Sequence, residues 1–132
     1  MRRAHLSAGI LATIVFLLTG QLMRHHTPPM DTFDDATRLL YRSRHIYLLG
    51  SALVNLMLGL YLHRLSGRRS VVQAIGSALL LLSPALLVIA FFVEPSRGFL
   101  EGRSWSTPGL YALFAGAMLH LACAIGVPRK SN

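Results

Sequence analysis

The sequence predicts an all-α membrane protein, a four-transmembrane-helix bundle with an amphipathic N-terminal extension of the second helix. Of its 132 residues, 53% are apolar and 14% are charged, whereas a soluble domain is about one-quarter charged. The apolar residues gather in four runs, each close to the ~20 residues that cross a bilayer, at 6–23, 45–63, 71–93 and 109–127. We therefore expect a single integral membrane domain over residues 1–132, and we exclude a soluble enzyme, a disordered tail and a disulfide scaffold.

The first run, residues 6–23, follows a basic start at Arg2 and Arg3. A basic start before an apolar stretch is also typical of a signal peptide. However, no A-x-A-like cleavage site follows, and three more apolar runs lie downstream. We therefore expect the first run to be retained as a transmembrane helix.

The second run, residues 45–63, is continued upstream by a helical pattern. A Pro-Pro pair at residues 28–29 prevents an earlier start, and Thr32 and Asp35 have the spacing of a capping box. A helix over residues 33–63 would be about 46 Å long, longer than the ~30 Å of a bilayer core. We expect its first three turns to project beyond the membrane or to lie along its surface.

Residues 33–44 form this amphipathic extension. Its apolar side comprises Phe33, Ala36, Leu39 and Leu40, and its polar side comprises Asp34, Asp35, Arg38 and Arg42. Asp34 and Arg38 are spaced i,i+4 with the acid first, the favourable order for an ion pair.

The third run, residues 71–93, begins after a second capping-box spacing, Ser70 and Gln73, and ends at an acid–proline pair. Pro84 lies inside the run, so we expect a kink there. We also expect the hydroxyl of Ser83 to bond a carbonyl that the proline frees.

The fourth run, residues 109–127, is bounded on both sides. Thr107 is in the N-cap position, Pro108 is at the first helical position, and Pro128 follows the run. These signals predict the fourth transmembrane helix.

Four spans place both termini on the same side of the membrane. That side carries seven basic residues: Arg2, Arg3, Arg64, Arg68, Arg69, Arg129 and Lys130. The other side carries Arg24, Arg38, Arg42, Arg44, Arg97 and Arg103, together with all five acids. The compact basic loop at residues 64–69 and the basic start favour cytoplasmic termini.

The net charge of +8 comes from basic residues that flank apolar runs. At such positions arginines meet lipid headgroups and fix orientation. We therefore expect the lipid bilayer and anionic headgroups as partners, and no nucleic acid. Tyr41, Arg42 and Arg44 are candidates to contact a lipid phosphate, because arginine pairs bidentately with phosphate.

Small and polar residues inside the runs predict contacts between helices. Ser51, Asn55 and Gly59 share one side of the second span, and Gly116, His120 and Cys123 share one side of the fourth. Small residues let helix backbones approach, and polar side chains hydrogen-bond across the contact. The leading hypothesis is a non-catalytic protein that acts through helix contacts, as an accessory or assembly subunit of a membrane complex or as a homo-oligomer.

The six histidines give a competing hypothesis, a metal- or haem-binding module. His25, His26 and His45 lie near methionines on the side opposite the termini, a donor set that suits copper. His63 and His120 lie toward the terminal side and could hold haem b. No cofactor is expected under the leading hypothesis.

Enzymes and transporters are two further classes of protein to consider. No catalytic motif occurs, and Cys123 is the sole cysteine, so we expect no enzyme. No charged residue lies centrally in a run, which disfavours ion-coupled transporters. A small-molecule permease would need a polar cavity between Ser51 and Asn55 on one helix and His120 and Cys123 on another.

Overall fold

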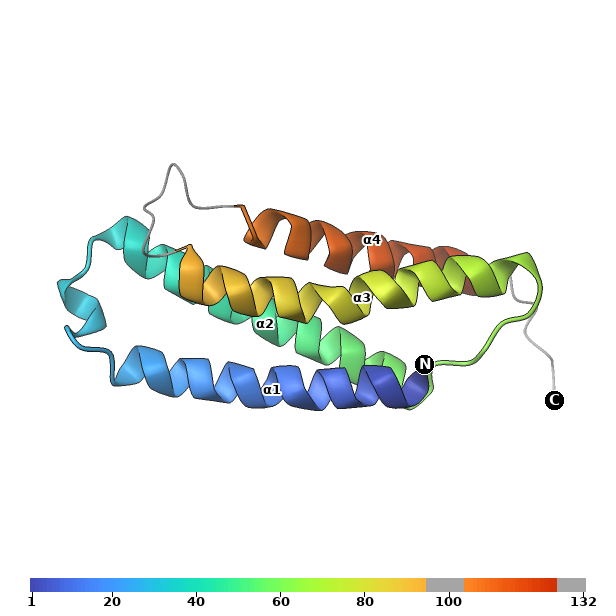
Figure 1. Ribbon diagram of the computed structural model, residues 1–132, viewed down its shortest axis with the longest axis horizontal. Coiled ribbons are helices and arrows are strands. Elements are labelled where there is room, and N and C mark those ends of the chain that lie inside the picture. Colours follow the sequence, from blue (N-terminus) through green and yellow to red (C-terminus); the bar gives the residue numbers. More distant parts are fainter. Residues whose placement is uncertain (95–103, 126–132) are drawn as a thin grey trace.

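The computed structural model describes residues 1–94 and 104–125, which form four α-helices and one short 3-10 helix (Figure 1). The elements are α1 (Arg2–Arg24), η1 (Met30–Thr32), α2 (Asp35–Tyr61), α3 (Arg68–Val93) and α4 (Ser106–Ile125). The described residues contain no strand, so the predicted all-α class is confirmed.

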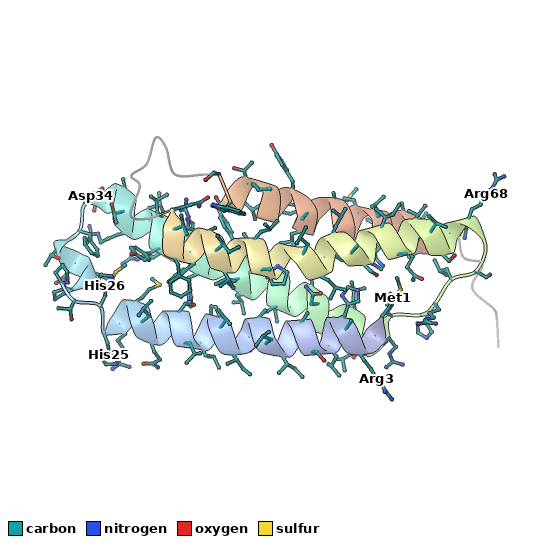
Figure 2. The ribbon with its side chains drawn as sticks, viewed as in Figure 1. Met1, Arg3, His25, His26, Asp34 and Arg68 are labelled. Carbon is teal, nitrogen blue, oxygen red and sulfur yellow. The ribbon has the colours of Figure 1, made fainter. Side chains whose placement is uncertain are left out.

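The helices run alternately in opposite directions along one long axis (Figure 1). α1 lies mainly against α2, α3 lies mainly against α4, and these two hairpins meet chiefly through α2 and α3. Met1, Arg3 and Arg68 therefore lie at one end of the bundle, which we call the N-terminal end (Figure 2). His25, His26 and Asp34 lie at the opposite end.

Three of the helices are long and apolar enough to cross a membrane. They are α1, α3 and α4, with mean hydropathies of 1.9, 2.4 and 1.6. These values indicate a membrane protein. α2 is not among the three, because Arg44, His45 and Asn55 dilute its apolar residues.

The predicted start of α2 is wrong by two residues, because another residue caps the helix. The carboxylate of Asp34 accepts hydrogen bonds from the backbone N–H of Thr37 at 3.0 Å and from its hydroxyl at 2.6 Å. Thr32 lies in η1 and donates to the carbonyl of Pro29, so it forms no capping box with Asp35. The helix ends at Tyr61, before the predicted His63.

The expected ion pair on this helix also has a different acid. Arg38 pairs with Asp35, at spacing i,i+3, instead of Asp34. Asp34 is engaged as the N-cap, and these hydrogen bonds from Thr37 lower the pKa of its exposed carboxyl.

The capping box predicted for α3 does not form either. α3 begins at Arg68, directly after Gly67, whose φ of 65° lies in the left-handed region that favours glycine. Ser70 donates to the carbonyl of Gly67 at 2.7 Å. Gln73 instead holds the preceding loop, donating to the carbonyl of His63 and accepting from the N–H of Leu65.

Pro84 lies inside α3, as predicted, but the hydroxyl of Ser83 does not serve that helix. Ser83 donates at 2.9 Å to the carbonyl of Gly109 in α4. A proline at position 84 removes the N–H that would bond the carbonyl of Leu80. That carbonyl accepts a hydrogen bond from the side chain of Asn55 in α2, at 2.9 Å.

α4 begins at Ser106, one residue before the predicted N-cap Thr107. The reason lies in α3: the carboxylate of Glu94 accepts from the N–H groups of Trp105 and Ser106 at 2.7 and 2.8 Å. A side chain from another helix therefore occupies the capping role. The predicted stop at Pro128 lies outside the described residues.

The bundle interior contains both apolar and polar residues. Leu48, Leu87 and Phe91 form an apolar core toward the end that carries Asp34, where Arg44 and Glu94 are also buried. Toward the N-terminal end the buried polar residues include His5, Ser51, Asn55, Gln73 and Ser77. This second group contains the candidate site.

Candidate functional site

A cluster of polar side chains, one from each helix, is buried toward the N-terminal end. It consists of His5 (α1), Asn55 (α2), Ser77 (α3) and His120 (α4). The first three are buried with at most 1% of their surface exposed, and His120 is half-buried. We call these four residues the polar cluster.

Hydrogen bonds fix the orientation of Asn55 at its centre. Its amide nitrogen donates to the carbonyls of Ser51 and Leu80, both at 2.9 Å. Its amide oxygen lies 2.8 Å from Nδ1 of His5. Because an amide oxygen only accepts, Nδ1 of His5 must carry the proton.

This tautomer leaves the second nitrogen of His5 as a lone-pair acceptor. Nε2 of His5 is buried and has no hydrogen-bond partner in the described part of the chain. Such groups are rare in folded proteins, since most buried polar atoms are paired. The orphaned nitrogen is the most unusual polar atom of the cluster.

His120 lies beside His5. The two ring centroids are 6.2 Å apart, with an angle of 82° between the ring planes. Nε2 of His120 is 3.1 Å from the hydroxyl of Ser77. A Cβ placed at Gly76 would lie 3.1 Å from Cδ2 of His120, so this edge of the ring faces α3 and Nδ1 lies on the other edge.

Glycines let the helices approach around the cluster. A Cβ at Gly9 would lie 2.7 Å from the backbone of Leu56, and one at Gly59 would lie 2.7 Å from the backbone of Leu6. A Cβ at Gly116 would lie 2.6 Å from Leu80. All three glycines lie at contacts between neighbouring helices of the same chain.

The small and polar residues singled out in the sequence all lie inside this bundle. Ser51 is buried and donates to the carbonyl of Leu48 at 3.0 Å. Cys123 is also buried, with its thiol 3.7 Å from the carbonyl of Arg69. The remaining four, Asn55, Gly59, Gly116 and His120, lie at the contacts described above.

Three histidines predicted to bind metal, His25, His26 and His45, lie in different surroundings. His25 is exposed at the end of α1, whereas His26 bonds the carbonyl of Pro28 and contacts aromatic rings (Figure 2). His45 stacks on Phe16 at 4.1 Å and bonds the hydroxyl of Thr19. Among residues 1–94 and 104–125, no three histidine, cysteine or acidic side chains are grouped to hold a metal.

The histidines considered for haem, His63 and His120, line one cavity at the N-terminal end. The cavity has a volume of about 580 Å³, and Met57, Gln73 and Cys123 also line it. His63 is exposed in the loop after α2, whereas His120 is directed into the bundle toward Ser77. His5 is not among the predicted site residues, yet its ring contacts the ring of His120.

A buried ion pair ties three helices together at the opposite end. Nε of Arg44 donates to Glu94 at 2.5 Å, and both side chains are at most 2% exposed. Burial raises the pKa of the Glu94 carboxyl, but the hydrogen bonds from Ser106, Trp105 and Arg44 outweigh it and hold the pKa below its usual value. The guanidinium of Arg44, predicted to contact a lipid phosphate, is therefore buried against Glu94.

The other two residues of that phosphate prediction have different positions. Tyr41 is half-buried and contacts the ring of Phe91 at 5.5 Å. Arg42 is exposed and lines an open cavity of about 360 Å³ together with Arg24, Arg38 and Asp31. Three arginines and one acid therefore line this cavity, and Arg38 also pairs with Asp35.

Comparison of the chain with known protein families, with curated proteins and with solved structures finds no significant match.

Proposed function

We propose that the chain is a four-span integral membrane protein of non-catalytic type, which acts through helix contacts as an accessory or assembly subunit or as a homo-oligomer. The observation that carries the proposal is that polar side chains lie inside the bundle and large apolar side chains lie on its surface. The polar side chains of the bundle interior are hydrogen-bonded inward, while large apolar side chains on every helix face outward.

α2 is the fourth span in this proposal, despite its polar composition. Its outward face carries Leu39, Ile46, Leu53, Met57 and Leu60, each more than half exposed. Its polar residues Arg44, Ser51 and Asn55 are buried against the other helices. A face of this kind is suited to lipid, and a helix of 27 residues is about 40 Å long, enough to span.

A groove between α1 and α3 is the surface we assign to contact with another helix. It has a volume of about 410 Å³ and only apolar residues line it, among them Ala8, Ala12 and Ala85. Small residues on a helix surface let a second transmembrane helix approach closely. The small and polar stripes of α2 and α4 are used within the chain, whereas the small residues of this groove stay open to another helix.

The first experiment tests whether α1 and α2 both span the membrane. Reporter tags fused at residue 1, in the loop at residues 64–67 and in the loop at residues 27–33 are assayed for accessibility from each side of the membrane. We expect the first two tags on the cytoplasmic side, because Arg2, Arg3, Arg68 and Arg69 lie at that end. A tag at residues 27–33 on the same side as residue 1 would contradict the proposal.

The second experiment tests association. Ala85→Trp fills the groove, and Ala115→Trp places the same side chain at an exposed position on α4. We expect the first variant alone to reduce the oligomer fraction, measured by light scattering in detergent and by native gels of membranes. A reduction seen only in membranes identifies an accessory role, and one seen in purified protein identifies self-association. If both variants behaved alike, the groove would not be the contact surface.

The alternative of a small-molecule permease receives no support from this geometry. Ser51 and Asn55 are fully buried and hydrogen-bonded, so no polar cavity opens between them and His120.

A further inference from the structure

The orphaned nitrogen of His5 and the ring of His120 have the arrangement of an incomplete metal site. A ligating histidine generally donates its other N–H to an oxygen, which fixes its tautomer and orients its lone pair. His5 has this arrangement, with Nδ1 donating to Asn55 and Nε2 left as a buried lone pair. His120 is similarly held, with Nε2 next to the hydroxyl of Ser77, which leaves Nδ1 for a ligand.

The separation of the rings fits one shared ion. An imidazole nitrogen lies about 2.0–2.1 Å from a bound metal such as zinc. With each ring centroid about 1.1 Å behind its nitrogen, two opposed imidazoles on one metal have centroids roughly 6 Å apart. The observed separation of His5 and His120 is 6.2 Å.

The charge around the cluster selects the ion. Every acid in the described residues, Asp31, Asp34, Asp35 and Glu94, lies toward the opposite end. The N-terminal ammonium acts on His5 as a positive charge, and Arg2 bonds the carbonyls of Gly59 and Leu60 at the same end. The cost of burying an ion rises with the square of its charge, so without a neutralising acid a monovalent ion is favoured over a divalent one.

The number of available ligands also favours a monovalent ion. Zn²⁺ takes four ligands in structural sites, and the cluster offers two imidazoles. Cu⁺ is satisfied by two opposed imidazoles, and imidazole is among the ligands that suit copper. We propose that His5 and His120 together bind one Cu⁺ ion, a role separate from the helix contacts proposed above.

Binding in this site needs neither a redox step nor the loss of a proton from His5. Cu⁺ adds to the lone pair that His5 already presents at Nε2. His120 adds through Nδ1 while its Nε2–H donates to Ser77. The ion keeps its single positive charge, and the two nitrogen–copper bonds replace ligands of the donor that delivers it.

The experiment uses the full chain in detergent under anaerobic conditions. Cu⁺ is offered in competition with a chromophoric Cu⁺ chelator, and bound copper is measured by elemental analysis. We expect one ion per chain, and we expect His5→Gln and His120→Gln each to lower the affinity by at least about tenfold, the lower end of what disturbing even an outer partner costs. His25→Gln, at an exposed histidine, and His63→Gln, at the cavity mouth, serve as matched controls that keep wild-type affinity.

Three results would overturn the proposal. They are no copper retained by the wild type, unchanged affinity in both His5→Gln and His120→Gln, or loss of copper in His63→Gln alone. If a variant fails to fold, X-ray absorption of the copper-loaded wild type decides: two nitrogen ligands are expected, and a shell dominated by sulfur contradicts the site. Light scattering of the same samples separates this outcome from failure of the proposed association.

Discussion

The side chain of Asn55 donates a hydrogen bond to the carbonyl of Leu80, the carbonyl that Pro84 leaves without its helical donor. A residue of α2 therefore repairs the gap in α3, and the same amide accepts from His5 in α1. One side chain thus connects three helices. An unpaired backbone carbonyl inside a membrane has no water to bond, so this connection stabilises both α3 and the bundle.

This arrangement predicts a coupling between positions 55 and 84. Asn55→Leu leaves the carbonyl of Leu80 and Nδ1 of His5 unpaired, which we expect to lower the free energy of unfolding by about 1–3 kcal/mol. Pro84→Ala restores the N–H that bonds Leu80, so Asn55→Leu should cost less in that background. Unfolding of the four proteins of this double-mutant cycle measures the coupling, and strictly additive effects would contradict it.

A second prediction concerns the close contact of α1 and α2. A Cβ at Gly59 meets the backbone of Leu6 at 2.7 Å, and backbone cannot move aside cheaply. Gly59→Ala should therefore lower the free energy of unfolding by about 1–3 kcal/mol, the cost of overpacking.

Gly50 supplies the matched control, because a Cβ there meets nothing within 4 Å. Gly50→Ala in the same helix should leave stability unchanged or raise it by about 0.5–1 kcal/mol, through the higher helix propensity of alanine. Denaturation of the two variants in the same detergent compares them directly. Equal losses of stability would show that the helices do not approach at Gly59.

A third prediction follows from the buried pair of Arg44 and Glu94. The folded state holds the pKa of Glu94 below its ordinary value of 4.5, since the hydrogen bonds to the carboxylate outweigh its burial. The folded state therefore binds fewer protons than the unfolded state below this pH. Stability that is present above pH 4.5 should be lost as the pH falls through the folded pKa.

The variant Glu94→Gln tests this dependence. It should cost about 3–5 kcal/mol at neutral pH, because it leaves the charge of Arg44 buried without its acid. Its stability should also fall less steeply in acid than that of the wild type, measured as the unfolding midpoint against pH. As a control, Asp34→Asn keeps an N-cap and removes an exposed carboxyl whose pKa is also lowered in the folded state. If the stability of Glu94→Gln fell in acid as steeply as that of the wild type, Glu94 would not be the group responsible for the pH dependence.

The sequence predicted where the helices lie, but it did not predict which side chains bond between them. Apolar runs and their borders depend on neighbouring residues, so four helices were found within a few positions. Partners depend on how distant helices are rotated. Ser83 was expected to serve its own helix, whereas it bonds Gly109 in α4, and Arg44 pairs with an acid 50 residues away.

His5 was missed although a signal was present. His5, Gly9, Ala12 and Thr19 are the buried residues of α1, a stripe of small and polar residues at helical spacing. The same spacing singled out Ser51, Asn55 and Gly59 in α2. What the sequence could not supply was the pairing of His5 with His120, since only the arrangement of α1 and α4 in space brings them together.

The last prediction concerns Arg42 and Arg44, which the sequence makes equal candidates for contact with a lipid phosphate. Arg42 is exposed and lines one cavity with Arg24 and Arg38, and these three positive charges outnumber the two negative ones of Asp31 and of Asp35, the partner of Arg38. Arg42→Gln should therefore reduce the anionic phospholipid that copurifies with the protein, measured by mass spectrometry, and leave thermal stability unchanged. Arg44→Gln should do the reverse, because its guanidinium is buried against Glu94. If Arg44→Gln loses bound phospholipid and keeps its thermal stability, this guanidinium contacts the headgroups. That result would contradict the buried ion pair between Arg44 and Glu94.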